Sequence, residues 1–280
     1  TDKLLAKSLG ADLLPEHAER FTAVRGDISK PGLGMSDENR RLVVARATHL
    51  LHNAASVRFD LPLDEARKHN VHGTEGMLEL GHEVARGGRL ERFGYVGTCY
   101  VAGDRTGVVL ADELDVGQGF RNTYEQTKCE SEKLVREQQA HLPIVIFRPS
   151  IIVGDSRTGR TQSFNVIYWP LQIYAKGMWP DFFIGNLDAP SDVVPVNFVA
   201  DSLLYLMDQE ASNGCCFPLA AGVDKVATNR TIITMASEFF DRPFPEIISP
   251  DNFSDEERIR RYNELSPTQR SMIAQGIQYL

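Results

Sequence analysis

Short apolar segments alternate with longer segments of helical period, and this alternation constrains the fold more than any other feature. The apolar segments have the length and the β-branched or aromatic content of buried strands, and they cover residues 21–28, 47–55, 91–98 and 143–150. Helical periods cover residues 36–47, 63–86 and 122–139. Strands that alternate with helices favour a parallel sheet with both faces covered. We therefore predict an α/β fold with a doubly wound parallel sheet, which binds its ligands at the carboxyl ends of the strands.

The pattern changes after Gly154, where an aromatic-rich stretch covers residues 164–186. This stretch either forms the core of a second lobe or provides an apolar wall for a long hydrophobic substrate, and the sequence favours neither. A short strand and a helix are expected within residues 191–207, and two helical pieces separated near Pro267 close the chain. We expect a core over residues 1–154 and a smaller C-terminal lobe over residues 155–280.

Charge and cysteine content narrow the function classes. The formal net charge of -8 argues against nucleic acid as the main partner, because proteins that bind it usually carry a basic footprint. The four cysteines show no CxxC spacing and are expected to be reduced thiols, and we expect no metal site.

The chain has neither a signal peptide nor a run of about 18 apolar residues, so we expect no transmembrane segment and a cytoplasmic location.

Tyr124 and Lys128 lie four residues apart near the start of the helical segment 122–139, so they share one helical face. A Lys ammonium beside a phenol favours the phenolate and lowers the Tyr pKa, which suits the Tyr for proton transfer near neutral pH. Taken alone, the spacing is also typical of two solvated residues on a helix. Thr98, at the end of the segment 91–98, adds a hydroxyl at the strand edge where the following helix begins.

Two other expected strands also end in small or polar residues. Asn53, Ala54 and Ala55 end one segment, and small side chains there let a ligand approach the backbone closely. Asp27 and Ile28 end the segment before it, where the Asp27 carboxylate is suited to accept a hydrogen bond from an adenine amino group. Each feature alone is typical of a turn, but their occurrence at successive strand ends favours a shared site.

Together these residues resemble the extended short-chain dehydrogenase/reductase superfamily over about residues 21–207. The resemblance implies that Thr98, Tyr124 and Lys128 form its Thr/Ser, Tyr, Lys catalytic set. It also implies cofactor-side or supporting roles for Asp27, Ile28, Asn53, Ala54, Ala55, Asn70, Lys128, Arg148, Pro149 and Ser150.

Within that superfamily, the segments `VRGDISKPGLGMSD`, `HNAASVRFDLPLDEARKHNVHGT`, `VGTCYVAG` and `SDVVPVNFVAD` are most similar to fatty acyl-CoA reductases and thioester reductase domains. This similarity implies lipid metabolism and an NADP-dependent oxidoreductase that reduces an acyl thioester of coenzyme A or an acyl carrier protein. The product is an aldehyde, or an alcohol after a second hydride transfer. A hydroxysteroid dehydrogenase or a sugar-nucleotide epimerase would share the catalytic set, although the apolar stretch 164–184 argues against a sugar. A non-catalytic binding module is a further alternative.

One superfamily motif is missing from the 280 residues. Members begin with a strand and a G-x-x-G-x-x-G turn that wraps the cofactor pyrophosphate, whereas this chain opens on a helix-like segment over residues 1–21 and contains no such turn. The basic residue expected to meet the 2′-phosphate of NADP is missing with it. We therefore expect a parent protein with a further βα unit, a truncated dinucleotide-binding core over residues 1–154, and a substrate lobe over residues 155–280. As written, the chain is expected to bind NADP poorly and to be inactive.

Overall fold

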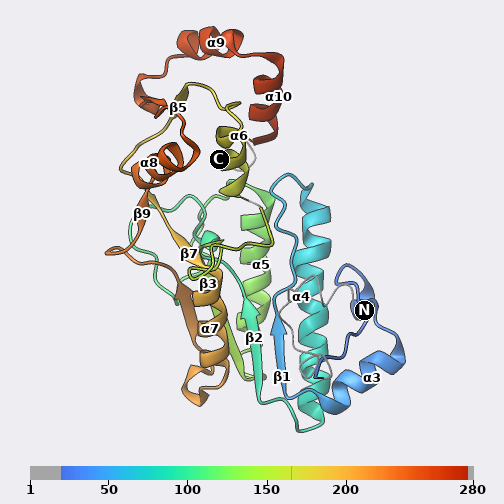
Figure 1. Cartoon of the computed structure of the whole chain (residues 1–280). Coiled ribbons are helices and arrows are strands. Elements are labelled where there is room, and N and C mark those ends of the chain that lie inside the picture. Colours follow the sequence, from blue (N-terminus) through green and yellow to red (C-terminus); the bar gives the residue numbers. More distant parts are fainter. Residues whose placement is uncertain (1–19, 165, 277–280) are drawn as a thin grey trace. The chain divides into compact units, whose positions relative to one another are not determined.

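A four-stranded sheet forms the core of the computed structural model, which describes residues 20–164 and 166–276 (Figure 1). The strand order is β1-β2-β3-β8, and β1 pairs with β2, and β2 with β3, in parallel. The strands are β1 His49–His52, β2 Arg92–Val96, β3 Ile144–Pro149 and β8 Cys216–Leu219. Three of the four expected strands and the predicted α/β fold with a parallel sheet are confirmed.

Helices cover both faces of this sheet. Helix α4 (Leu63–Arg86) packs against α5 (Thr123–Glu137), and a side chain at Gly81 of α4 would meet the ring of Phe93 at 3.1 Å. A side chain at Gly94 would instead meet Met207, the last residue of α7 (Val196–Met207), at 2.6 Å. Because successive strand residues point to opposite faces, α4 and the end of α7 lie on opposite sides of β2. The double winding of the sheet is therefore confirmed.

The central strands carry the hydrophobic core. Every residue of β2 and β3 is buried, as expected for parallel strands with helices on both faces. A buried apolar cluster joins these strands to α4 and α5 through Phe93, Tyr95, Ile144, Val84 and Val135, among others. Helix α3 (Asp37–Arg46) begins as predicted, with Ser36 Oγ accepting a hydrogen bond from the Asn39 amide at 3.3 Å.

The strand expected over residues 21–28 is not formed. Phe21 is 48% exposed, and none of the strands in the described part of the chain pairs with this segment. A strand needs a hydrogen-bonded neighbour, and an apolar sequence alone does not supply one. The segment ends instead in a tight turn, in which the Asp27 amide donates to the Leu33 carbonyl at 2.6 Å before the 3-10 helix Pro31–Gly34. Most of the helix expected over residues 1–21 lies outside the described residues.

The chain divides into two compact units. The first unit is Thr1–Arg148 with Leu203–Phe217, and the second unit is Pro149–Ser202 with Pro218–Leu280. The second unit contains the strand pairs β4 (Ile151–Val153) with β7 (Val193–Pro195), β5 (Phe182–Ile184) with β10 (Glu246–Ile248), and β6 (Pro190–Ser191) with β9 (Ala227–Thr228). Its helices include α6 (Tyr168–Ala175) and α8 (Asn229–Phe240). The two predicted C-terminal helices are α9 (Asp255–Glu264) and α10 (Pro267–Gly276).

A long loop in the first unit, residues 103–119, connects the 3-10 helix Cys99–Ala102 to the start of α5. Its two ends are tied together, because the Asp104 amide donates to the Gly119 carbonyl at 3.0 Å and the Gly119 amide donates to Asp104 Oδ1 at 2.9 Å. Arg121 Nη1 donates to the Gly103 carbonyl at 2.6 Å. The two ends of the 103–119 loop are therefore hydrogen-bonded to each other. In the chain, this loop lies between Thr98 and Tyr124.

Substitution of Gly103 tests this closure. Gly103 has a φ of +61°, and a Cβ there would collide with the Gly119 carbonyl oxygen. Gly103→Ala should lower the free energy of unfolding by about 3 kcal/mol, because it combines a positive φ with a clash against backbone. Gly107→Ala is the matched control, since Gly107 has a φ of +84° with open space around it, and it should cost only about 1 kcal/mol. Equal losses in urea unfolding would show that the loop is not closed at Gly103.

Candidate active site

Helix α5 begins at a well-defined point, and this places Tyr124 in its first turn. The Asn122 side chain accepts a hydrogen bond from the Glu125 amide at 2.9 Å, while Glu125 Oε2 accepts from the Arg121 amide at 3.0 Å. This reciprocal arrangement resembles a capping box and fixes the first turn of the helix. The ring of Tyr124 is also held by Phe59, with ring centroids 5.4 Å apart.

Thr98 and Tyr124 are in contact. Thr98 follows β2 and is buried, with its Oγ1 accepting a hydrogen bond from the Tyr100 amide at 3.2 Å. A side-chain hydrogen bond also joins Thr98 to the half-buried phenol of Tyr124. The structure therefore brings together two of the three residues predicted to be catalytic.

The prediction that Lys128 lowers the pKa of Tyr124 is wrong for this structure. Burial raises the pKa of Tyr124 above its ordinary value of 10.0, the hydrogen bond from Thr98 opposes this rise, and the charge of Glu125 adds to it. The Lys128 ammonium points to β2 instead, where Nζ donates to the Val96 carbonyl at 2.8 Å and lies 4.6 Å from the centre of the Tyr95 ring. Tyr124 is therefore a protonated phenol at neutral pH, which suits it to donate a hydrogen bond.

Lys128 is a buried cation. Burial lowers its pKa from 10.5 to about 8, and the negative charge of Glu132 one turn further along α5 opposes this shift. His52 nearby is neutral, because burial and the charge of Lys128 lower its pKa to about 3. Its Nε2 lies 3.0 Å from Thr74 Oγ1. At neutral pH most Lys128 side chains therefore carry a charge that burial makes costly to keep.

Asn70 connects three elements around the site through hydrogen bonds. This buried side chain of α4 donates through Nδ2 to Thr127 Oγ1 at 2.9 Å and to the Ser56 carbonyl at 3.2 Å. Its Oδ1 accepts a hydrogen bond from the Ser56 amide at 2.8 Å. Asn70 thereby joins α4, α5 and the segment after β1 that carries the exposed Asn53 and Ala54 and the half-buried Ala55. Its contacts support these elements.

Arg148 is occupied by protein groups. Its guanidinium forms a buried ion pair with Glu132, with Nη2 to Oε1 at 2.8 Å and Nε to Oε2 at 3.0 Å. Nη2 also donates to the Glu113 carbonyl at 2.8 Å. These contacts point Arg148 toward α5 and the 103–119 loop, which fits a supporting role. Sequence reasoning missed Glu132, although its four-residue spacing from Lys128 is the same signal that linked Lys128 to Tyr124.

The remaining predicted residues have other contacts. Asp27 Oδ1 accepts from the amide and hydroxyl of Ser29 at 3.0 and 2.6 Å, which closes its own turn. Ile28 packs against Gly73 of α4. Pro149 and Ser150 belong to the second unit, where the Ser150 amide donates to the Leu219 carbonyl at 3.1 Å.

The second unit contains an apolar cavity of about 220 Å³. Its wall includes Leu171, Tyr174, Trp179, Phe183, Ile233 and Ala236. The polar groups on the wall are engaged with each other or with backbone. Ser191 Oγ donates to Asn229 Oδ1 at 2.7 Å, and the Tyr174 hydroxyl donates to the Pro243 carbonyl at 2.7 Å. The cavity therefore offers mainly apolar surface to a ligand.

Only part of the aromatic stretch of residues 164–186 lines this cavity. Phe183 lies in its wall, whereas Phe164, Tyr168 and Trp169 are not among the lining residues. Phe164 is 57% exposed and packs edge-on against Tyr168, with their ring centroids 5.5 Å apart.

Within residues 20–164 and 166–276, the helices are all too short or too polar to cross a membrane.

Known proteins resemble this chain in sequence. Residues 1–203 match the family model described as male sterility protein. The chain is 29% identical over 218 residues to "Fatty acyl-CoA reductase wat" of Drosophila melanogaster, which covers 68% of this chain and 41% of that protein. It is 27% identical over 227 residues to "Nonribosomal peptide synthetase asaC" of Aspergillus flavus, which covers 73% of this chain and 20% of that protein. The chain thus spans less than half the length of either relative.

A solved structure shows the same fold. The terminal R domain from the myxalamid PKS-NRPS biosynthetic pathway superposes with a TM-score of 0.80 at 24% identity, covering 100% of this chain and 67% of that one. This likeness supports the fold, and the sequence match over residues 1–203 supports the family. The chain belongs to the male sterility protein family, within the extended short-chain dehydrogenase/reductase superfamily.

Proposed function

We propose that the full-length protein is an NADPH-dependent reductase of acyl thioesters, with Thr98, Tyr124 and Lys128 as its catalytic residues. The observation that carries this proposal is the hydrogen bond between Thr98 and Tyr124 at the carboxyl end of the sheet, with the buried Lys128 one turn further along α5. Two hydroxyl groups that lie side by side can both donate hydrogen bonds to the same carbonyl oxygen of a bound substrate. This is the arrangement that stabilises negative charge developing on that oxygen.

Each residue then has a defined task. Bound NADPH supplies a hydride to the carbonyl carbon of the thioester. Thr98 and Tyr124 donate hydrogen bonds to the carbonyl oxygen as it becomes negative, and each such donor is worth on the order of 3 kcal/mol. The raised pKa of Tyr124 keeps its proton in place for this task. The carbonyl bond then re-forms as the carbon–sulfur bond breaks, the thiolate leaves and takes a proton from solvent, and the aldehyde remains.

The first unit fits one end of a dinucleotide better than the other. Ala54 and Ala55 after β1 leave room near the backbone for a flat ring, and the Lys128 ammonium is suited to hold ribose hydroxyls. Within residues 20–164 and 166–276, no glycine-rich turn connects a strand to a helix in the way that a pyrophosphate site requires. We therefore assign Asn53, Ala54, Ala55 and Lys128 to the nicotinamide ribose end, and we place the assay in the full-length protein.

The apolar cavity of the second unit is the proposed place for the hydrophobic part of the substrate. An apolar cavity of roughly 150 Å³ holds a benzene molecule, so about 220 Å³ has room for a longer alkyl segment. A sugar would find few free hydrogen-bonding groups there, because Ser191, Asn229 and Tyr174 are engaged. This favours an acyl chain, carried by coenzyme A or a carrier protein, over a sugar nucleotide.

Tyr124→Phe tests the proposed activity. The substitution keeps the ring that packs on Phe59 and removes only the donor. NADPH oxidation by the full-length protein with an acyl thioester should fall by about 10²-fold or more, with little change in melting temperature. Tyr205→Phe, at a residue that is 66% exposed, is the control and should leave the rate unchanged. A Tyr124→Phe protein with the original rate would refute the assignment.

Lys128→Met should separate activity from stability. The pKa of Lys128 is about 8 when folded and 10.5 ordinarily, so below pH 8 both states hold the proton and the buried charge costs stability. As the pH rises from 8 to 10.5, the folded chain loses this proton first and the cost disappears. Lys128→Met should therefore raise the free energy of unfolding at pH 7 by on the order of 2 kcal/mol, and this gain should shrink toward pH 10. The reductase activity should be lost.

Lys68→Met is the control on the neighbouring helix α4. Lys68 pairs with Glu65 at the surface, away from the 103–119 loop, and this pairing raises its pKa. The variant should lose a little stability at pH 7 and keep its activity. If urea unfolding shows that Lys128→Met is the less stable of the two at pH 7, then the Lys128 ammonium serves the fold.

Ala236→Leu tests the cavity. Ala236 is buried in α8 and lines the cavity, so a larger side chain there shortens the available space. The KM of the full-length protein should rise for long acyl thioesters and stay the same for short ones, because each buried methylene that is excluded costs about 0.8 kcal/mol. Met235→Leu, at the neighbouring 65% exposed position, should change neither. An equal rise for all chain lengths would place the acyl chain elsewhere.

A further inference from the structure

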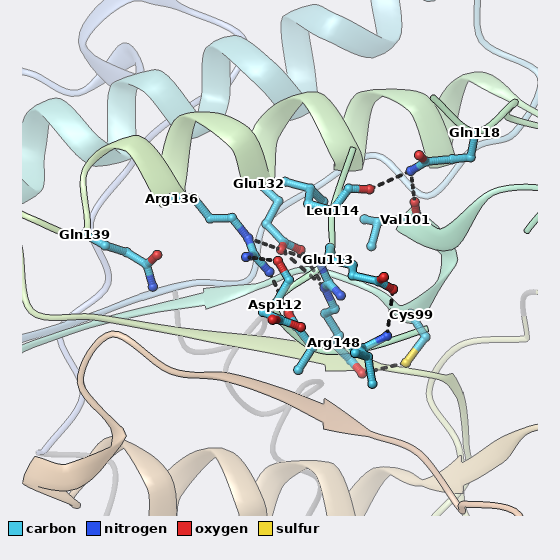
Figure 2. A network of polar contacts seen from close by, with 12 residues as sticks. Cys99, Val101, Asp112, Glu113, Leu114, Gln118, Glu132, Arg136, Gln139 and Arg148 are labelled. Atoms are coloured by element: carbon cyan, nitrogen blue, oxygen red, sulfur yellow. Dashed lines mark hydrogen bonds and ion pairs between the residues drawn. The ribbon is translucent and has the colours of Figure 1, made fainter. Parts of the chain in front are cut away.

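Glu132 has no part in the chemistry proposed above, yet it is the most enclosed charge in the described part of the first unit. Its side chain is fully buried on α5, one turn beyond Lys128. Arg148 binds both of its oxygens, and Arg136 Nε donates to Oε1 at 2.9 Å (Figure 2). One carboxylate thus orients two guanidinium groups, one from β3 and one from α5.

The same two arginines hold three consecutive carbonyl groups of the 103–119 loop (Figure 2). Arg136 Nη2 donates to Ala111 at 2.7 Å, and Nη1 donates to Asp112 at 2.9 Å. Arg148 Nη2 donates to Glu113 at 2.8 Å. Because a guanidinium is planar and rigid, the orientation that Glu132 imposes also fixes where these carbonyls lie.

Other contacts extend this attachment along the loop. The Glu113 side chain pairs with Arg105 Nη2 at 2.7 Å and accepts from the Leu110 amide at 3.0 Å. Gln118 Nε2 donates to the carbonyls of Val101 and Leu114 at 2.8 and 2.7 Å. The segment at residues 111–113 is therefore connected to both ends of the loop.

The loop lies between the two catalytic hydroxyls in the chain. Thr98 precedes it by five residues, and Tyr124 follows it by five residues. Hydrogen bonds between Asp104 and Gly119 join the two ends of the loop, and these ends lead directly to Thr98 and to Tyr124.

We propose that Glu132 is a positioning residue, which, through Arg136 and Arg148, fixes the 103–119 loop along α5 and thereby holds Thr98 against Tyr124. The proposal rests on the proposed reductase function for its effect on rate, but the attachment of the loop can be measured without any activity. Small displacements matter here, because a shift of about 1 Å at reacting groups can lower a rate by roughly 10²-fold.

The test compares Glu132→Gln with Glu130→Gln in the full-length protein. Glu130 also lies on α5 and forms a two-point ion pair, with Arg67 at 2.7 and 2.8 Å, but it has no hydrogen bond to the 103–119 loop among the described contacts. Each substitution therefore replaces a carboxylate of α5 that is paired with an arginine by a neutral amide. Arg136→Gln is the third variant, because Arg136 is partly exposed and its loss leaves the pair of Glu132 with Arg148 in place if Glu132→Gln does not fold.

Hydrogen exchange measures the loop directly. The Leu110 and Glu113 amides are hydrogen-bonded within the loop, and peptides that contain them should exchange at least about 10-fold faster in Glu132→Gln or Arg136→Gln. Glu130→Gln should exchange like the original protein in these peptides. Unchanged exchange in both loop variants, or equal acceleration in Glu130→Gln, would overturn the proposal.

Kinetics then measure the consequence. For acyl thioester reduction, kcat should fall by about 10-fold in Arg136→Gln while KM for NADPH stays within twofold, because Lys128 is untouched. A variant with a faster-exchanging loop and the original kcat would also overturn the positioning role. If the original protein reduces no thioester, the proposed function fails, and the exchange data still decide whether Glu132 holds the loop.

Discussion

The buried ion pair between Glu132 and Arg148 is the interaction on which the rest of the first unit depends. It joins α5 to β3, and through Arg136 and the carbonyls of residues 111–113 it also joins α5 to the 103–119 loop. Removal of one partner from a buried pair typically costs about 3–5 kcal/mol, because the other charge is left without compensation. Two apolar residues would fill the same space without that risk. We propose that the charged pair is kept because it specifies the position of the 103–119 loop along α5.

In our proposal the two units have separate tasks. The first unit holds the polar chemistry, namely the contact of Thr98 with Tyr124 and the buried ammonium of Lys128. The second unit holds a cavity whose polar groups are engaged with each other or with backbone. In our proposal the first unit acts on the thioester carbonyl and the second binds its apolar chain. Such a division lets the apolar cavity change with the substrate while the residues around the carbonyl stay the same.

Helices that are determined by residues close together in the chain could be predicted from the sequence. Helix α4 occupies the predicted residues 63–86, and α5 (Thr123–Glu137) lies within the predicted segment 122–139. Features that depend on distant partners were not predictable in this way. Residues 21–27 have a strand-like composition but no described strand beside them, and the Lys128 ammonium turns to the Val96 carbonyl, 32 positions away in the chain, instead of to Tyr124. The family resemblance implied a cofactor-side or supporting role for Arg148, and the sequence does not show that Glu132 faces it from α5.

The central claim is that this site transfers a hydride from NADPH to the carbonyl carbon of an acyl thioester. The most direct test uses the full-length protein, an acyl thioester with either carrier, and NADPH that carries deuterium at the transferable position of the nicotinamide ring. Mass spectrometry of the released product should find deuterium bound to the former carbonyl carbon of an aldehyde, or of an alcohol after a second transfer. Release of the unlabelled carboxylic acid, or of an aldehyde without deuterium at that carbon, would contradict the claim.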